Sequence, residues 1–544
     1  MRRSVLFFFF FFLLPVSPVF AQVKTAPDYD QSKKFMELMA LIRGYYTDSV
    51  DEKKLVEDAM VHVLEELDPH SSFITSSEVK RQEEPLVANF EGVGITFQLF
   101  KDTILVMDVI SGGPAQKVGI MAGDKIVWVN DTLVAGIKIT NPDVMKKLRG
   151  PKNTKVKVSV LRRGVRQDFL ITRDRIPIYS VDVSYMAAPG IGYIKLSRFA
   201  ATSLKEVLDA MTQLRAQGME KLILDLQDNT GGYLYTAVDL CSQFLKDREL
   251  IVYTQGLHSE RFPYYSDGRG PFQDGKLIVL INEGSASASE ILSGCMQDND
   301  RGLVVGRRSW GKGLVQKPFP LSDGSQVRLT TAQYYTPSGR CIQRPYDKGK
   351  KDYQDEYSRR IQTGELFGAD TFHFADSLKY KTIKNNRTVY GGGGVMPDVF
   401  VPLDTSSNSS LLSDLIRKGT ENQFALAYVD SRRATLLQQY PTPDIFLQQF
   451  EADDSVLSDL FQMAAKDSII RVDSLFKISE KAIRIRVKAL IGRNLHDNYV
   501  FWKTMNPMNP VYARALEMMQ SANFDRWLAP LESTDKLKKK KNKK

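Results

Sequence analysis

The sequence NEGSASASEI, residues 282–291, crowds small residues around a serine between a predicted strand and a predicted helix. Residues 276–281, KLIVLI, form a short apolar run typical of a buried strand. Apolar residues then recur at helical spacing from Ile291 to Met296. A strand that turns sharply into a helix leaves backbone N–H groups that can receive the negative oxygen of an acyl-transfer intermediate. We therefore expect a nucleophilic serine here; tight packing at a helix N-cap is the alternative for this run taken alone.

A second stretch, SWGKGLVQ at residues 309–316, places Lys312 between two glycines and near Trp310 and Leu314. An ammonium group becomes a usable base only when apolar surroundings lower its pKa. Gln316 would share a face with Lys312 in a strand and could then orient the amine. A serine, a lysine base and an orienting amide follow the logic of the Ser-His-Asp triad with different side chains.

Together the two stretches resemble the Ser/Lys/Gln pattern of the carboxy-terminal processing (tail-specific) serine peptidases. The resemblance implies that Ser287 is the nucleophile, Lys312 the general base and Gln316 the residue that orients this base. It also matches Asp298 to an auxiliary acidic position between the serine and the lysine. A carboxylate at a helix end or a turn is the alternative role for Asp298.

The sequence QDNTGG, residues 227–232, follows another apolar run and resembles the family's Asp-Leu-Arg-x-Asn-x-Gly-Gly loop. The resemblance implies an oxyanion hole built from the backbone N–H of Gly231 or Gly232 and from that of Ala288. Gln227 stands where arginine is usual and Thr230 where proline is common. These departures leave the choice between the two glycines open.

Residues 84–175 resemble a PDZ domain, most specifically in the run GIMAGDKIVWVN at 119–130. The resemblance implies a peptide-binding loop that leads into a strand, formed by Gly92, Val93, Gly94 and Ile95. Exposed N–H groups of such a loop capture a terminal carboxylate, while the strand edge pairs with an extended peptide.

Arg149 follows a predicted helix in the position of the PDZ groove helix and precedes a Gly-Pro turn. We expect it to belong to the peptide-binding region and to couple PDZ occupancy to the catalytic core. A plain surface charge is the alternative role.

The resemblance implies an α/β fold, in which a crotonase-like α/β catalytic core carries an inserted PDZ domain, an N-terminal helical segment and a mainly helical C-terminal extension. The predicted division is a signal peptide at 1–21, the helical segment at 22–83, the PDZ domain at 84–175, the Ser/Lys peptidase core at 176–404 with an insertion or lid at 345–390, the extension at 405–530 and a lysine-rich tail at 531–544.

Two amphipathic helices are predicted between Phe35 and Leu67 from apolar residues at helical spacing. They could support a homo-oligomer, as the resemblance implies, or bury against the same chain. The following turn, LDPHSSF at residues 67–73, resembles a family turn that precedes the PDZ domain. We expect its histidine, His70, to cap the turn.

The first 21 residues read as a secretory signal peptide, with Arg2 and Arg3, an apolar core and small residues at the cleavage-determining positions. We therefore expect export to the periplasm or the cell envelope. No cysteine follows the apolar run, so a lipoprotein anchor is not indicated.

The formal net charge of +10 comes mostly from the terminal lysines and the signal arginines. A near-neutral body argues against a nucleic-acid enzyme. The 3 cysteines are widely spaced, and none of the 5 histidines lies in a metal or Ser-His-Asp motif. We expect no metal and no other cofactor.

These features predict an exported serine endopeptidase that recognises the free C-termini of unfolded or flexibly tailed proteins through its PDZ domain. It would cleave them through an acyl-enzyme. The alternative is a non-catalytic PDZ scaffold or ligand-binding protein that retains the fold. A penicillin-binding-type Ser-x-x-Lys motif is excluded locally, because Glu290 stands three residues after Ser287.

Overall fold

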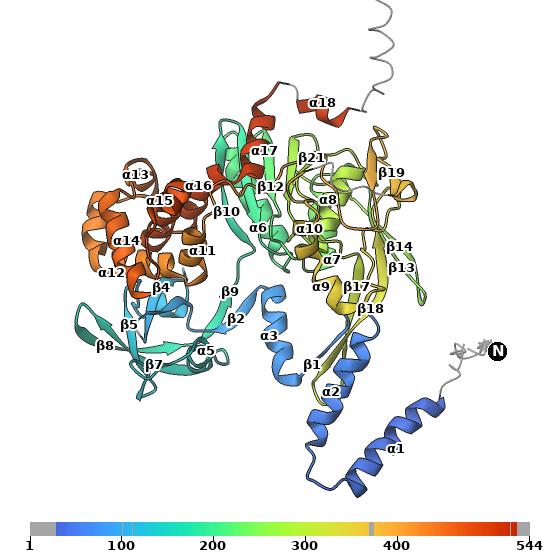
Figure 1. Cartoon of the computed structure of the whole chain (residues 1–544), viewed down its shortest axis with the longest axis horizontal. Helices are drawn as coiled ribbons and strands as arrows, with labels where there is room; N and C mark the ends of the chain where they lie inside the picture. Colours follow the sequence, from blue (N-terminus) through green and yellow to red (C-terminus); the bar gives the residue numbers. More distant parts are fainter. Residues whose placement is uncertain (1–28, 101, 111, 369–374, 523, 530–544) are drawn as a thin grey trace, which may run out of the picture. The chain divides into compact units, whose positions relative to one another are not determined.

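The computed structural model describes residues 29–100, 102–110, 112–368, 375–522 and 524–529 (Figure 1). The chain divides into two compact units, one up to His62 and one from Val63 onward. The predicted signal peptide and the predicted lysine-rich tail lie outside the described residues. Among those that are described, no helix is both long and apolar enough to span a membrane.

The first unit contains the two helices predicted near the N-terminus, α1 (Tyr29–Tyr45) and most of α2 (Glu52–Glu65). Large apolar side chains of α1 are exposed, among them Phe35, Leu38 and Leu41. An exposed apolar face favours association with another surface. The homo-oligomer stays a prediction, which the molar mass in solution would test.

The second unit contains a PDZ domain near its start. Its sheet has the order β3-β4-β5-β7-β8, with β6 paired to β5. These strands are β3 (Ile95–Phe100), β4 (Thr103–Val109), β5 (Lys125–Val129), β6 (Thr132–Leu133), β7 (Lys155–Arg162) and β8 (Val165–Thr172). Two helices, α4 (Pro114–Lys117) and α5 (Asn141–Leu148), complete it. A short ribbon of β2 (Asn89–Gly92) and β9 (Asp174–Pro177) joins the two ends of the domain.

The catalytic core is organised around a sheet of the order β10-β11-β12-β15-β16-β21, in which every neighbouring pair after β10-β11 is parallel. Its strands are β10 (Val181–Ala188), β11 (Ile191–Leu196), β12 (Lys221–Asp225), β15 (Lys276–Ile281), β16 (Leu303–Gly306) and β21 (Val399–Phe400). Apolar runs such as KLIVLI form these strands because both faces of the sheet are covered.

Successive residues of the strands enter two different cores. Leu277 and Val279 pack with helices α6 (Ser203–Ala216), α7 (Leu234–Ser242) and α8 (Ala288–Asp298). Ile278 and Leu280 share the opposite core with α17 (Pro510–Gln520), from the C-terminal extension. The last long helix of the extension is therefore part of the catalytic core.

A second sheet has the order β1-β18-β13-β14, with β17 paired to β18. Its strands are β1 (Ser72–Ile74), β13 (Leu250–Gly256), β14 (Ser259–Tyr265), β17 (Leu314–Pro320) and β18 (Gln326–Tyr335). Because β1 pairs with β18, the turn that contains His70 is brought to the segment that contains Lys312. Helix α3 (Ser76–Val87) then leads from β1 to the PDZ domain.

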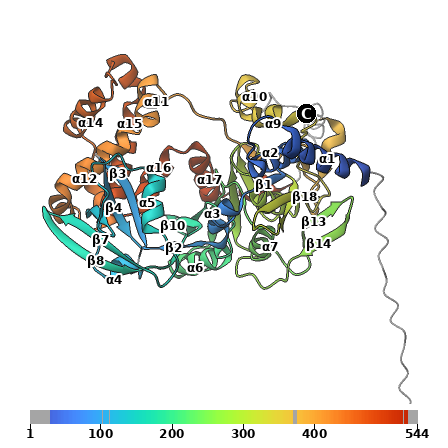
Figure 2. The ribbon, with the colours of Figure 1, turned by 90° about the horizontal axis from the view of Figure 1, so that it is seen from below.

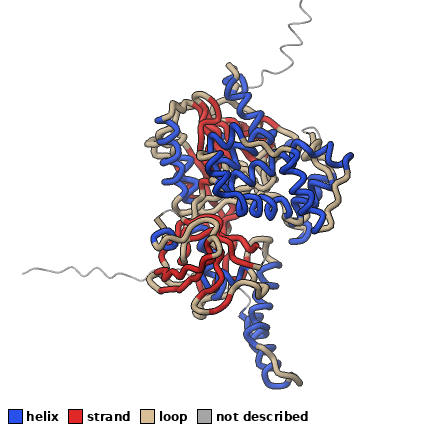
Figure 3. The backbone as a smooth tube through the Cα atoms, turned by 90° about the vertical axis from the view of Figure 1, so that its left-hand side faces the viewer, coloured by secondary structure: helices blue, strands red, loops and turns tan. Residues whose placement is uncertain are grey.

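The predicted insertion holds α9 (Gly349–Gln354), α10 (Glu356–Gln362), η2 (Asp376–Leu378) and the hairpin β19 (Lys379–Lys381) and β20 (Thr388–Tyr390). The extension is mainly helical, as predicted (Figures 2 and 3). Its helices are α11 (Ser410–Arg417), α12 (Thr420–Gln439), α13 (Pro443–Gln449), α14 (Asp454–Lys466), α15 (Asp473–Leu495), α16 (Asn498–Met505), η3 (Asn506–Met508), α17 and α18 (Phe524–Leu528). Helices α11 to α16 enclose an apolar core of their own.

Candidate active site

Ser287 lies at the N-cap of α8, directly after the turn that leaves β15. Its φ of 55° is in the left-handed region, which L side chains rarely adopt. Holding a residue in such a conformation costs about 1–3 kcal/mol of conformational free energy, and residues strained in this way cluster at functional sites. The backbone N–H of Ser287 donates to Oε2 of Glu290 over 2.8 Å.

Glu290 is fully buried and accepts four hydrogen bonds. Three donors are backbone N–H groups, from Ser287 at 2.8 Å, Gly311 at 2.7 Å and Lys312 at 2.9 Å, and the fourth is Oγ of Ser309 at 2.5 Å. Burial raises the pKa of Glu290, and these donors act against that rise. One carboxylate thus ties the serine turn to the lysine loop, a role that the sequence interpretation missed.

Tyr334 provides a second link between the same two segments. Its hydroxyl lies 3.0 Å from the carbonyl oxygen of Ser287 and also contacts that of Lys312. Tyr334 is buried in the second sheet, on β18. Ser287 and Lys312 are therefore held from both the α8 side and the β18 side.

Lys312 is half-buried and precedes β17. Burial lowers the pKa of Lys312, and the positive charge of Arg328 lowers it further, while Glu290 and Asp68 act in the opposite direction. A lowered pKa makes the neutral amine, which can accept a proton, more accessible.

A cavity of about 470 Å³ brings together six residues predicted for the site. They are Ser287, Lys312, Gln316, Gly231, Gly232 and Ala288. Gln316 lies on β17, but Lys312 does not, so the two residues do not alternate along one strand. The amide of Gln316 donates to Oγ1 of Thr330 over 3.3 Å.

The two candidate oxyanion glycines differ in their hydrogen bonds. The N–H of Gly231 donates to Oδ1 of Asn229 over 2.9 Å. Within the described part of the chain, the N–H of Gly232 has no acceptor. A Cβ at Gly231 would lie 2.8 Å from Cβ of Ser287, and a Cβ at Gly232 would lie 2.1 Å from the carbonyl oxygen of Phe199. Both positions therefore require glycine, and only Gly232 keeps its N–H uncommitted.

His70 also lines the cavity, which its role as a predicted turn residue did not anticipate. Burial lowers the pKa of His70 to about 4, with a further contribution from the charge of Lys312. The ring is therefore neutral at pH 7, and Nε2 lies 3.0 Å from the hydroxyl of Tyr353. The turn itself is capped by Asp68, which accepts from the backbone N–H groups of His70 and Ser71.

Asp298 is the last residue of α8 and does not line the cavity. Its carboxylate lies 2.8 Å from Nη2 of Arg340, and both side chains are fully buried. Oδ2 also accepts from the backbone and the hydroxyl of Ser338. The structure places Asp298 in a buried ion pair outside the lining of the cavity.

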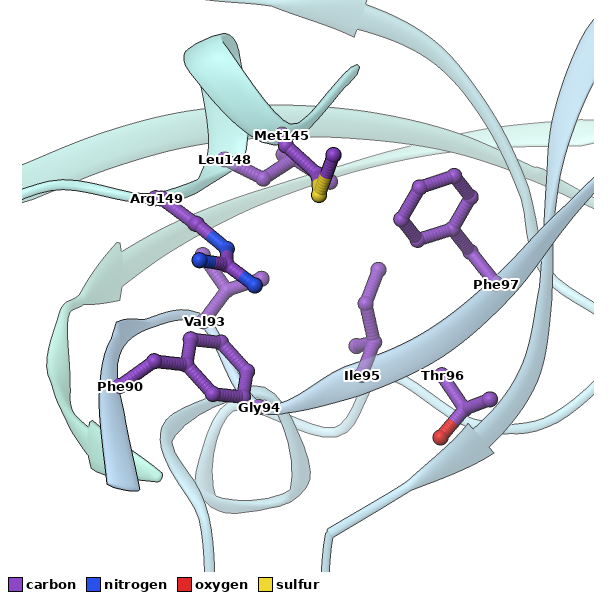
Figure 4. Close-up of a pocket in the computed structure, with 9 residues that line it drawn as sticks. All are labelled: Phe90, Val93, Gly94, Ile95, Thr96, Phe97, Met145, Leu148 and Arg149. Carbon is purple, nitrogen blue, oxygen red and sulfur yellow. The ribbon is translucent and has the colours of Figure 1, made fainter. Parts of the chain in front are cut away.

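A separate cavity of about 260 Å³ lies in the PDZ domain (Figure 4). Four residues predicted for peptide binding line it, namely Val93, Gly94, Ile95 and Arg149. Gly92 does not line it; it ends β2, where a Cβ would lie 3.1 Å from the ring of Phe90. Other lining residues, which the sequence interpretation did not name, are Phe90, Thr96, Phe97, Met145 and Leu148. The guanidinium of Arg149 lies 4.4 Å from the centre of the Phe90 ring and pairs with Glu84.

Comparison with known proteins gives three family matches: peptidase family S41 over residues 190–350, the PDZ domain over 92–172, and a family of unknown function (DUF8443) over 411–497. A carboxy-terminal-processing protease of Bartonella bacilliformis is 34% identical over 355 residues, which cover 63% of this chain and 81% of that protein. The chain belongs to the carboxy-terminal-processing proteases of peptidase family S41. It is a serine peptidase with a PDZ domain, and the predicted family and fold are confirmed.

A carboxyl-terminal-processing protease of Synechocystis is 38% identical over 253 residues, or 45% of this chain and 58% of that protein. Among solved structures, a photosystem II D1 C-terminal processing protease aligns with a TM-score of 0.34 at 30% identity. It covers 57% of this chain and 85% of its own. The peptidase and PDZ family matches end before the extension, and the family of unknown function matches residues 411–497 of the extension.

Replacing Glu290 with glutamine should lower kcat by about 100-fold, because misplacement of reacting groups by about 1 Å has an effect of this size. The amide brings two N–H groups into a site that already supplies four donors. Steady-state cleavage of a peptide by Glu290→Gln gives the value. Glu421→Gln removes a buried carboxylate paired with Arg486 in the extension and is the matched control. A kcat within twofold of wild type for Glu290→Gln would refute the positioning role.

Proposed function

We propose that the protein is an exported endopeptidase that cleaves peptide bonds with a Ser287/Lys312 dyad. The observation that supports this most is that a strained N-cap serine and a half-buried lysine line one cavity and are fixed to each other through Glu290. An N-cap serine alone would be unremarkable, since such residues are common at helix starts.

In the proposed reaction, Oγ of Ser287 forms a bond to the carbonyl carbon of the substrate and transfers its proton to Nζ of Lys312. The negative oxygen of the tetrahedral intermediate accepts from the N–H groups of Gly232 and Ala288. The C–N bond then breaks, and Lys312 returns the proton to the leaving amine. Water hydrolyses the acyl-enzyme by the same steps, with Lys312 again as the base.

Gln316 is proposed to orient the amine of Lys312 once substrate occupies the cavity. Its amide is held by Thr330 on the neighbouring strand and lines the same cavity as the base. The neutral imidazole of His70 adds no positive charge beside Lys312, so it does not oppose protonation of the amine during the reaction.

The PDZ domain is proposed to capture the free C-terminus of an unfolded or flexibly tailed protein. Backbone N–H groups of the loop Val93–Ile95 would bind the terminal carboxylate, and Arg149 places a cation at the rim of the same cavity. Phe97, Met145 and Leu148 form an apolar wall, which suits an apolar terminal side chain (Figure 4). No nucleic acid is expected as a partner.

Arg149 is proposed to couple this capture to catalysis through α3. Arg149 pairs with Glu84 on that helix, and two other residues of α3, Glu83 and Leu86, line the active-site cavity. A bound carboxylate would compete with Glu84 for the guanidinium. Helix α3 would thereby transmit PDZ occupancy to the wall of the active site.

Export is proposed from the N-terminal signal sequence, in which two arginines precede an apolar core. The periplasm or the cell envelope is the proposed location. The non-catalytic scaffold is disfavoured, because the serine, the lysine and the glutamine all line the active-site cavity.

Ser287→Ala and Lys312→Ala should each lower the rate of cleavage of an unfolded reporter protein by roughly 1000-fold or more, because each removes a member of the dyad. The reporter with a free C-terminus should be cleaved faster than its amidated form. Lys317→Ala changes an exposed lysine of β17 and should leave the rates unchanged. Persistent cleavage by Ser287→Ala would contradict the mechanism.

The value of kcat/KM should rise with pH as Lys312 loses its proton. Because the pKa of Lys312 is lowered, this rise should level off at a lower pH than it would for an ordinary lysine with a pKa of 10.5. Arg328→Gln removes a positive charge that favours the neutral amine. The rising limb should therefore move to higher pH in this variant, whereas Arg417→Gln, at an exposed site on α11, should leave it in place. A limb that does not move in Arg328→Gln would refute the electrostatic assignment.

Arg149→Ala should reduce the preference for a free over an amidated reporter terminus to about one, because the variant removes both the cation at the PDZ cavity and its pair with Glu84. The two cleavage rates, measured side by side, give the ratio. Arg166→Ala, at a half-exposed arginine of β8, is the control and should keep the preference. An unchanged ratio in Arg149→Ala would exclude the coupling.

A further inference from the structure

The C-terminal extension reaches the loop that carries the proposed oxyanion glycine. The N-cap of α17 is Asn509, whose Oδ1 accepts from the backbone N–H groups of Val511 and Tyr512 at 3.0 and 3.4 Å. Its other side-chain atom, Nδ2, donates to Oε1 of Gln227 over 3.3 Å. Asn509 therefore fixes the start of a core helix and contacts the oxyanion loop at the same time.

Gln227 is the first residue of that loop and is buried. Its backbone N–H donates to Oδ1 of Asp225 over 2.8 Å, and its amide Nε2 donates to both carboxylate oxygens at 3.1 and 3.2 Å. Because the backbone N–H and the side-chain Nε2 of Gln227 both donate to Asp225, its Oε1 is left to accept from Asn509. This is the position where the family resemblance leads one to expect arginine, which has no acceptor.

The extension makes a second contact near the start of the loop, with Lys195, which itself contacts Gln227 and Asp225. Nζ of Lys195 donates to the carbonyl oxygen of Gln227 over 3.1 Å and lies 3.5 Å from Oδ2 of Asp225. This buried ammonium lies 4.8 Å from the centre of the Trp502 ring on α16. A cation over an indole face is attracted by the ring, more strongly where water is excluded.

The rest of the loop is held by the core itself. Nδ2 of Asn229 donates to the carbonyl oxygen of Leu196, and its Oδ1 accepts from the N–H of Gly231. The backbone of Asn229 also accepts from Ala286, beside the nucleophile. At the other end of the loop, the contacts from the extension add to those that Asp225 and Lys195 make with Gln227.

We propose that the extension positions the oxyanion loop for catalysis, with Asn509 and Trp502 as positioning residues that act through Gln227. This inference rests on the proposed function, which assigns the loop its role in binding the oxyanion. It assigns a task in the reaction to the extension, whose residues 411–497 match a family of unknown function; Trp502 and Asn509 follow that matched stretch. Truncation of the extension would also strip the central sheet of α17, so the test needs single substitutions.

Asn509→Asp is the most informative variant. It keeps the oxygen that caps α17 and removes the N–H donor to Gln227. We expect kcat to fall about tenfold. This is less than the roughly 100- to 1000-fold loss that follows removal of an oxyanion donor, because the variant displaces the loop but keeps its N–H group. KM, the affinity of the PDZ domain for a C-terminal peptide and the melting temperature should stay near wild type. Thr442→Ala removes the cap of α13 within the extension and should leave kcat unchanged.

A peptide aldehyde gives a readout that loss of stability alone would not move, because its serine adduct places an oxygen in the oxyanion hole. Its inhibition constant should rise by the same factor by which kcat falls in Asn509→Asp. Trp502→Leu, which keeps an apolar side chain but no ring face, should show the same pattern and serves if Asn509→Asp does not fold.

A double-mutant cycle tests whether Asn509 acts through Gln227. The Gln227→Ala, Asn509→Asp double variant should be no slower than Gln227→Ala alone, whereas independent losses that multiply would overturn the proposal. Ser287→Ala separates the two levels of inference. If Ser287→Ala still cleaves, the proposed function fails and this inference with it. If Ser287→Ala is inactive and folded Asn509→Asp keeps its kcat, only the role of the extension is refuted.

Discussion

The carboxylate of Glu290 holds the backbone N–H groups of Ser287 and Lys312, which belong to different segments of the core. Burial of a carboxylate costs several kcal/mol, whereas a hydrogen bond to a charged group contributes about 1.5–3 kcal/mol. The burial is therefore offset only while most of its four donors stay in place. Any displacement of the serine turn or of the lysine loop removes donors from this buried carboxylate. The relative position of Ser287 and Lys312 is therefore coupled to the stability of the fold.

The two sheets explain why these segments meet. The parallel strands β12 and β15 end at the same edge, and their carboxyl ends lead into the loop with Gly232 and the turn with Ser287. The second sheet supplies the other half, because β17 and β18 carry Gln316 and Tyr334 and β1 brings the turn of His70. The active-site cavity lies where the edge of one sheet meets the other.

Local patterns in the sequence predicted the elements well. The run KLIVLI with its small-residue turn gave β15 and α8, and the glycine-flanked runs gave the PDZ domain. The pattern could not give the partners of buried polar groups, which lie far apart in the chain. Three of the four donors to Glu290 lie 19 to 22 positions away from it, and the contact of Asn509 with Gln227 joins residues 282 positions apart. The difference between the N–H groups of Gly231 and Gly232 likewise depends on one side-chain oxygen, from Asn229.

The extension contacts both the PDZ domain and the core, but the two contacts differ in strength. Lys125 of the PDZ domain pairs with Asp430 on α12 over 2.9 Å, with side chains 37% and 23% exposed. Such an ion pair contributes about 0–1 kcal/mol. Against the core, α17 buries Val511, Met518 and Met519, and burial of each such side chain contributes about 1.5–3 kcal/mol. The extension should therefore move with the catalytic core rather than with the PDZ domain, so its contact with Gln227 can persist when the PDZ domain shifts.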